Sequence, residues 1–184
     1  LTINPGTTIM FKEGTSLIVN GTLNAVGTSI NNITFDVDKN SPSAGDWEGL
    51  NISPYATVNF GYVNIANANY GLVLDHCSYN INHSTFKHCN VGIYQYQNTA
   101  YNQLIDNCYF DSNSVGIFSV SSEPIITNST FFCNGTSCIV LEGSALFGSV
   151  ESYGNNHFIE NDQNIQVSDI GYAFLGRETC TIQG

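Results

Sequence analysis

The sequence predicts an all-β fold, a right-handed parallel β-helix, and three features of the chain point to it. Short segments alternate apolar and polar residues with a period of two, which is the period of a strand. These segments recur about every 20 to 27 residues. The stretches between them are rich in Asn, Gly and Ser, which favour tight bends and leave no room for helices. We therefore expect a single β-helix domain over residues 1–184, with about eight coils.

The first third of the chain contains short apolar runs separated by turn signals. The turn signals are the dipeptides Pro5-Gly6, Glu13-Gly14, Asn20-Gly21 and Val26-Gly27. The predicted strands cover residues 1–3, 8–11, 17–19, 33–35 and 50–52, with a further strand around Leu23. A coil of this size cannot bury its apolar face alone, so the coils must stack on one another.

The rest of the chain carries an internal repeat. Its leading residue is apolar and recurs at spacings of 21, 24, 21 and 27 residues: Ile65, Phe86, Phe110, Phe131 and Phe158. Six positions later comes a small residue, with an aliphatic residue close behind it: Gly71, Gly92, Gly116, Ser137 and Asn164. Five positions before the leading residue lies another apolar position: Phe60, Ile81, Ile105, Ile126 and Tyr153. The spacing varies because turns differ in length while strands do not.

The repeat predicts columns of like side chains that run from coil to coil. Four phenylalanines are expected to stack inside the solenoid: Phe86, Phe110, Phe131 and Phe158. Two asparagine ladders are expected at the bends: Asn113, Asn134 and Asn161, and Asn107, Asn128 and Asn155. A leucine-rich repeat would need more Leu, and a sandwich of antiparallel hairpins would not give the four phenylalanines one shared position.

Two motifs resemble segments of secreted microbial β-helices. They are Leu1-Thr2-Ile3-Asn4-Pro5-Gly6-Thr7-Thr8-Ile9-Met10-Phe11, continued by Gly14-Thr15-Ser16-Leu17-Ile18-Val19-Asn20-Gly21-Thr22-Leu23, and Gly45-Asp46-Trp47-Glu48-Gly49-Leu50. With its repeat, the chain resembles the right-handed parallel β-helix proteins of the pectin-lyase-like superfamily over nearly its whole length. The resemblance implies the fold but no single function, because the superfamily includes lyases, hydrolases, adhesins, phage spikes and structural proteins. A body of about eight coils would be on the order of 40 Å long.

The composition excludes two classes of partner. Lys and Arg number 4 against 15 Asp and Glu, which gives a formal net charge of −11. A chain with so few cations has no electrostatic footprint for nucleic acid or for an anionic membrane surface. No apolar run reaches the roughly 18 residues of a membrane span, so we expect no membrane insertion. The 11 Phe and 10 Tyr predict a packed core.

Cysteines and glycosylation motifs predict an extracellular protein. The six cysteines are an even set without zinc-ribbon spacing, and we expect them to form disulfides of undetermined pairing: Cys77, Cys89, Cys108, Cys133, Cys138 and Cys180. Six Asn-x-Ser/Thr motifs are candidate glycosylation sites: Asn20, Asn32, Asn51, Asn82, Asn128 and Asn134. The chain begins at Leu1, without an initiator Met or basic leader, and reads as a mature or trimmed piece.

The acidic residues around one expected turn form a candidate site. Asp36 and Asp38 should face outward from a strand, and Asp46 and Glu48 flank an inward Trp47. Three interpretations stay open: solubilising charge, Ca²⁺ coordination, and a carboxylate pair for glycoside hydrolysis. Lyases of the resembled superfamily use acidic calcium clusters with a basic residue, typically Arg. This chain has one arginine, Arg177, and its net charge would repel a polyuronate, so lyase activity is not expected.

Histidines and cysteines form a second, weaker candidate site. A zinc or copper centre would draw on His76, His83, His88 and His157, with Cys77 and Cys89. The repeat places His83 and His88 at different positions around a coil, which favours surface histidines instead. Apart from the calcium alternative, no cofactor is expected.

Two functions follow from these observations. The first is a non-enzymatic extracellular structural protein whose end coils join copies of itself into a microbial sheath, filament or surface layer. The alternative is a carbohydrate-binding or carbohydrate-active β-helix, or an adhesin, which would bind surface glycans. In that case exposed tyrosines would serve as platforms for sugar rings: Tyr55, Tyr62, Tyr94, Tyr96 and Tyr101.

Overall fold

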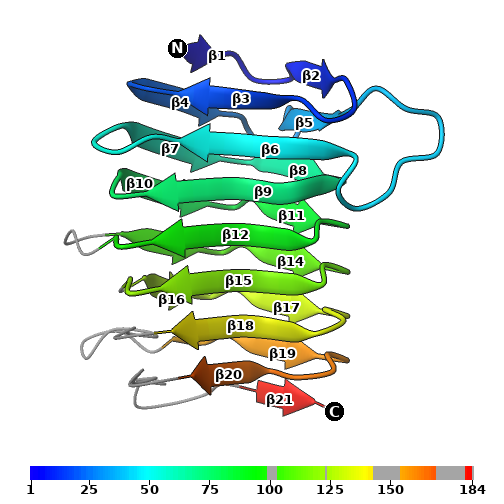
Figure 1. The fold of residues 1–184 in the computed structure, drawn as a ribbon, viewed down its shortest axis with the longest axis vertical. Helices are drawn as coiled ribbons and strands as arrows, with labels where there is room; N and C mark the ends of the chain where they lie inside the picture. Colours follow the sequence, from blue (N-terminus) through cyan, green and yellow to red (C-terminus); the bar gives the residue numbers. More distant parts are fainter. Residues whose placement is uncertain (99–102, 123, 143–153, 169–180, 184) are drawn as a thin grey trace.

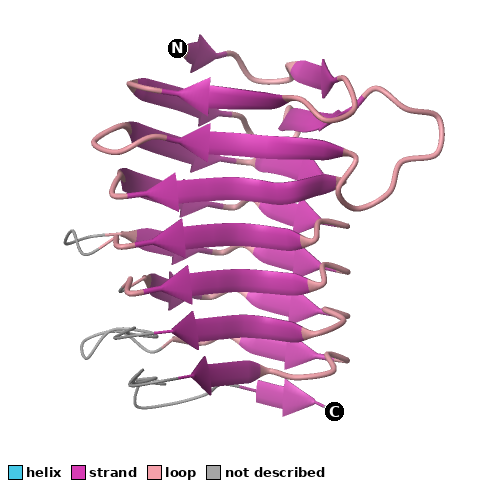
Figure 2. Ribbon diagram, in the orientation of Figure 1, coloured by secondary structure: helices cyan, strands magenta, loops and turns pink. Residues whose placement is uncertain are grey.

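The chain forms a parallel β-solenoid. The computed structural model describes residues 1–98, 103–122, 124–142, 154–168 and 181–183. Every regular element in these residues is a strand, and none is a helix (Figure 2). The front strands in Figure 1 point left while the chain descends from its N-terminus at the top, and the return strands lie behind, so the coil is right-handed. The predicted fold class is confirmed. Within the described residues, no helix could cross a membrane.

Three parallel sheets make up the three sides of the solenoid, and we call them sheets A, B and C. Sheet A contains β1 (Thr2–Ile3), β4 (Thr22–Val26), β7 (Thr57–Gly61), β10 (Ser78–Asn82), β13 (Leu104–Asp106) and β16 (Ile125–Thr127). Sheet B contains β2 (Thr8–Phe11), β5 (Ile33–Val37), β8 (Val63–Ala66), β11 (Thr85–Lys87), β14 (Tyr109–Asp111), β17 (Thr130–Phe132), β19 (His157–Ile159) and β21 (Thr181–Gln183). Sheet C contains β3 (Ser16–Val19), β6 (Trp47–Ile52), β9 (Ala68–Asp75), β12 (Val91–Tyr96), β15 (Val115–Val120), β18 (Ser137–Glu142) and β20 (Ile165–Ser168).

The described strands make about six complete turns, fewer than the eight expected from the average spacing. Part of the difference is one long turn: Asn24 of β4 pairs with Asn59 of β7, 35 residues later. Most of the extra residues lie between Val37 and Trp47, where the chain leaves the solenoid as the long loop at the right of Figure 1, and the rest lie between Val26 and Ile33. Loops that leave the solenoid add residues to a turn without adding a further turn.

A column of aromatic rings fills the interior. Phe86, Phe110, Phe131 and Phe158 are paired in register across sheet B. Their ring centroids lie 5.2, 4.7 and 5.1 Å apart and the rings are nearly parallel. In sheet A, the predicted second column is also in register: Phe60, Ile81, Ile105 and Ile126. Tyr153, expected to continue it, lies outside the described residues. Parallel pairing stacks equivalent residues, so the sequence repeat becomes a continuous apolar core.

A column of small residues lets sheet C pack against these rings. A Cβ atom at Gly92 would lie 2.6 Å from the carbonyl oxygen of Gly116 and 3.1 Å from Cδ1 of Phe110. In the next coil the sequence alignment is one residue out of register, because Ser137 pairs with Val115 and the column continues through Cys138. The corner before β18 is one residue longer than its predecessors, which shifts the register.

Short corners of differing length join the sheets, and most of those after β7 begin with a residue at positive φ. In the described part of the chain, all fourteen non-glycine residues with positive φ occupy corners, among them Tyr55, His76 and Gln97 between sheets C and A. At most corners, a small polar or thiol residue follows and turns inward. The hydroxyl of Ser129, for example, donates to the Thr127 carbonyl and accepts the Cys108 backbone N–H from the neighbouring coil. The corners therefore link one coil to the next.

The same corners explain why the expected disulfides are absent among the described cysteines. Cys77, Cys89, Cys108, Cys133 and Cys138 are free thiols, and Cys180 lies outside the described residues. The thiols of Cys89 and Cys108 donate to the carbonyl two residues back, at 3.4 Å each, as serine hydroxyls do at equivalent corners. These cysteines fill ladder positions at separate corners, and burial raises the pKa of both thiols to about 12.

Candidate binding site on sheet C

The outer face of sheet C carries a groove lined by aromatic and polar side chains. Its lining residues come from three successive strands, β6, β9 and β12, and we call this site the aromatic groove: Glu48, Asn51, Tyr70, Val73 and Tyr94. The groove has a volume of about 450 Å³. Asn51, Val73 and Tyr94 are paired in register, so parallel stacking brings them into one row across the strands. All three side chains are half-buried, which leaves part of each for a ligand.

Three rings form an aromatic strip along this face. The rings of Tyr70 and Tyr94 meet edge to face, with centroids 5.6 Å apart. Tyr94 also lies 5.6 Å from Phe118, which continues the same row on β15. These packing contacts fix the ring orientations before any ligand arrives. Flat, preoriented rings with polar groups beside them suit the apolar faces and hydroxyl edges of sugars.

A polar ladder runs beside the strip. Asn90 Nδ2 donates to Asn69 Oδ1 at 3.0 Å, and Asn69 Nδ2 donates to Glu48 Oε2 at 3.1 Å. Glu48 is thereby held at the edge of the groove, and it is the one carboxylate among the groove-lining residues. Burial, with help from the neighbouring Tyr70 and Glu142, raises the pKa of the Tyr94 phenol. The phenol therefore stays protonated at neutral pH, as a hydrogen-bond donor.

The four acidic residues singled out in the sequence are not gathered at one point. Asp46 accepts a hydrogen bond from Lys39 Nζ at 2.7 Å, and this contact, with the Ser43 backbone N–H, lowers its pKa. Asp36 accepts from Asn67 Nδ2 at 2.8 Å on sheet B. Asp38 is exposed just after β5, and Glu48 lies in the aromatic groove. Across the described residues, no three His, Cys, Asp or Glu side chains form a group able to hold a metal ion.

The histidines are likewise distributed over different corners and strands. His76 contacts Asp75 through Nδ1, and His83 stacks on Tyr62 with centroids 4.7 Å apart. His88 lies exposed at a B-to-C corner, and His157 opens β19. Cys77 and Cys89 are buried at separate corners. The metal site considered from the sequence is not assembled in the part of the chain that the structure describes.

The predicted aromatic platforms divide into several environments. Tyr94 lies in the groove, Tyr96 is exposed beside it, and Tyr55 is 93% exposed at a C-to-A corner. Tyr62 is occupied by its stacking on His83, and Tyr101 lies outside the described residues. Sequence reasoning missed Tyr70 and Phe118. The repeat could have predicted the position of Phe118, because Phe118 follows Gly116 by two residues just as Tyr94 follows Gly92.

The six glycosylation motifs also differ in exposure. Asn20, Asn32 and Asn128 are exposed, whereas Asn51 and Asn82 are half-buried. Asn134 is fully buried within its ladder. Comparison with protein-family models, curated proteins and solved structures found no match for the chain. The fold therefore defines the class, a right-handed parallel β-solenoid, and the sites must be interpreted from their own chemistry.

Proposed function

We propose that this chain is a non-enzymatic, extracellular β-helix that binds a neutral polysaccharide through the aromatic groove. The observation that carries the proposal is the strip Tyr70, Tyr94 and Phe118 beside the ladder that ends at Glu48. Aromatic faces pack against the C–H faces of sugar rings, and the amide and carboxylate groups pair with hydroxyls. The proposal includes membership of the pectin-lyase-like superfamily, which the stacked coils and the opening motifs support.

The charge of the molecule favours a neutral ligand over an acidic one. The chain carries a formal net charge of −11, and a polyuronate would be repelled before it reached the groove. Glu48, the single carboxylate of the groove lining, is held by Asn69. Glycoside hydrolysis uses two carboxylates about 5 to 9.5 Å apart, so a groove with one carboxylate supports binding rather than cleavage.

Affinity electrophoresis on neutral glucans, mannans and galactans, with polygalacturonate beside them, tests the proposal. We expect retardation by at least one neutral polymer and none by the polyuronate. Tyr94→Ala should weaken binding about tenfold, because it removes a central stacking surface. Tyr109→Ala is the matched control, since this partly exposed tyrosine also has a stacked partner, Phe132, but lies on sheet B. Equal loss in both variants, or no binding of any neutral polymer, would reject the groove as a saccharide site.

A second candidate function is a structural element of a microbial sheath, filament or surface layer, built from copies of this chain. The uninterrupted ring column from Phe86 to Phe158 supports it, because such a core stiffens the solenoid along its axis. Negative-stain electron microscopy distinguishes the two functions. Ordered polymers at micromolar concentration would favour the structural function, and discrete rods that bind polysaccharide would favour the first.

A further inference from the structure

A second pocket lies at the C-to-A corner next to the aromatic groove. It has a volume of about 360 Å³ and receives residues from three successive coils, and we call it the corner pocket: Tyr55, His76, Cys77, Ser78, Gln97, Asn98 and Gln103. Tyr55, His76 and Gln97 all stand at the positive-φ position of their corners. Backbone hydrogen bonds connect these corners, since the Tyr55 N–H donates to the His76 carbonyl at 2.9 Å. Equivalent corners thus present three different side chains at one pocket.

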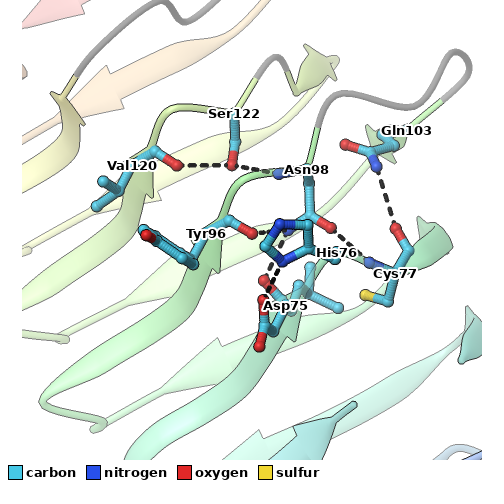
Figure 3. A network of polar contacts seen from close by, with 9 residues as sticks. Asp75, His76, Cys77, Tyr96, Asn98, Gln103, Val120 and Ser122 are labelled. Carbon is cyan, nitrogen blue, oxygen red and sulfur yellow. Dashed lines mark hydrogen bonds and ion pairs between the residues drawn. The ribbon is translucent and has the colours of Figure 1, made fainter. Parts of the chain in front are cut away.

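Buried hydrogen bonds hold the floor of this pocket (Figure 3). Asn98 accepts the Cys77 backbone N–H at 2.8 Å and donates through Nδ2 to the Leu74 carbonyl at 2.6 Å. The Asn98 backbone N–H donates to the Ser122 hydroxyl in the next coil at 2.9 Å. The floor is therefore fixed by contacts within the protein and does not depend on a ligand for its shape.

One buried polar atom in this pocket has no partner. Gln103 is 2% exposed, and its Nε2 donates to the Cys77 carbonyl at 3.1 Å. Its Oε1 is buried without any hydrogen bond, and it is the one such side-chain atom among the described residues. A buried acceptor left unpaired costs about 1–3 kcal/mol. A hydrogen-bond donor brought beside this oxygen would satisfy it.

The pocket adjoins the aromatic groove through Tyr96. Tyr94 and Tyr96 lie on the same outer face of β12, about 7 Å apart along the strand. The Tyr96 ring meets the His76 ring edge on, with centroids 6.0 Å apart, and His76 contacts Asp75. A ligand that lies along β12 over Tyr94 would therefore reach the corner pocket at the end of that strand.

We propose that the corner pocket is a second saccharide subsite, which takes a sugar residue of the chain bound in the aromatic groove. A sugar hydroxyl donates to Gln103 Oε1, other hydroxyls pair with Gln97 and His76, and the ring packs on the exposed Tyr55. This inference rests on the proposed function. It specifies that the polysaccharide lies along the strands, across the solenoid axis, and that recognition extends beyond the groove.

Calorimetric titration with neutral oligosaccharides, from disaccharide to hexasaccharide, tests this inference. The series comes from the polymer that gives the strongest retardation. Tyr55→Asn removes the ring and keeps a residue that tolerates positive φ. Gln103→Met removes the unpaired acceptor. Each variant should weaken binding of the longest oligosaccharide about tenfold and leave the disaccharide unchanged, because only a longer ligand reaches both subsites. In the wild type, the Gln103 side-chain amide NMR signals should shift with the longer ligands.

Tyr62→Asn is the matched control, because Tyr62 also has positive φ but occupies an A-to-B corner. Failure of the two proposals gives different results. Binding that is sensitive to Tyr94→Ala but unaffected at every length by Tyr55→Asn and Gln103→Met, with unmoved Gln103 signals, would overturn the second subsite alone. Absence of binding by any oligosaccharide would overturn the groove and the subsite together. If Gln103→Met fails to fold, Tyr55→Asn and the NMR signals still decide the outcome.

Discussion

Asn113 is joined twice to Asn134 in the next coil: its backbone N–H and its Nδ2 group both donate to Asn134 Oδ1, at 3.2 and 3.1 Å. Asn134 repeats the pattern, since its backbone N–H and its Nδ2 group both donate to Asn161 Oδ1, at 2.8 and 3.0 Å, and Nδ2 also donates to the Phe110 carbonyl. Each amide thus satisfies two backbone groups of the preceding coil, which for Asn134 are the Phe110 carbonyl and the Asn113 N–H. The asparagine ladder therefore forms hydrogen bonds between successive coils at the corners, where the β-sheet hydrogen bonds stop.

Replacing Asn134 by alanine should lower the free energy of unfolding by about 2–4 kcal/mol, because it leaves several buried groups without partners. The measurement is urea unfolding followed by the fluorescence of Trp47, the single tryptophan, which is buried and donates to the Ala66 carbonyl. Asn32→Ala is the control, since Asn32 is exposed. If both variants unfold at the same urea concentration, the ladder does not stabilise the fold as described.

Gly92→Ala should be destabilising by at least about 2 kcal/mol, because the added Cβ would press on the Gly116 carbonyl and the Phe110 ring. Gly21→Ala provides the matched comparison, since nothing lies within 4 Å of a Cβ at that position. Thermal unfolding by circular dichroism measures both. A Gly92→Ala protein with wild-type stability would mean that sheet C can move away from the aromatic column at little cost.

The buried thiols should make the protein sensitive to alkaline pH. A thiol with an ordinary pKa of 9.0 ionises in the unfolded chain, whereas burial raises the pKa of Cys89 and Cys108 to about 12 in the fold. Their contribution is therefore fully present below pH 9 and is lost as the pH rises toward 12. Between these values the free energy of unfolding should fall by about 1.4 kcal/mol per pH unit for each thiol.

Urea unfolding between pH 7 and pH 10 measures this effect against a Cys89→Ser, Cys108→Ser double variant. Serine hydroxyls occupy equivalent corners in this fold, for example at Ser122 and Ser129, so the double variant should fold. Its stability should fall less steeply above pH 9 than that of the wild type. Parallel pH curves for the two proteins would contradict the assignment of buried, neutral thiols.

Among the Asn-x-Ser/Thr motifs, those whose Asn side chain is exposed should carry glycan, and those whose Asn is buried should not. Expressed through a secretory pathway that glycosylates Asn-x-Ser/Thr, the protein should carry glycan at Asn32, whose side chain is exposed. Asn134 should be unmodified in folded protein, because its side chain is fully buried in the ladder. Peptide mass spectrometry after glycosidase treatment in H₂¹⁸O reads each position. Folded protein with substantial occupancy at Asn134 would be incompatible with the buried ladder.

Asn51 provides a separate test that connects glycosylation with binding. It is a glycosylation motif and also lines the aromatic groove. A glycan on Asn51 would occupy the groove, so a glycosylated fraction should lose binding to neutral polysaccharide, and Ser53→Ala, which removes the motif and keeps Asn51, should restore it. Equal binding by the glycosylated and unglycosylated fractions would argue that the polysaccharide lies elsewhere.

The solenoid and its core can be predicted from the amino-acid sequence alone. The spacing of Phe86, Phe110, Phe131 and Phe158 predicts the fold because parallel stacking brings equivalent positions of each coil into contact. The ladder through Asn113, Asn134 and Asn161 is predictable for the same reason. Core positions that stack from coil to coil recur at a regular spacing in the sequence, so they can be recognised without a structure.

The state of the cysteines and the positions of the two candidate sites depend on the three-dimensional packing of the coils. The sequence predicts a disulfide for Cys108, but the residue is a free thiol. Its corner places the thiol where serine hydroxyls lie at other corners, and it donates to the Asp106 carbonyl. The groove depends on side chains from three coils, and the corner pocket depends on the unpaired oxygen of Gln103. Such sites follow from the exact register and corner length of each coil, which a repeat pattern does not fix, because a single added residue changes the face on which a side chain lies.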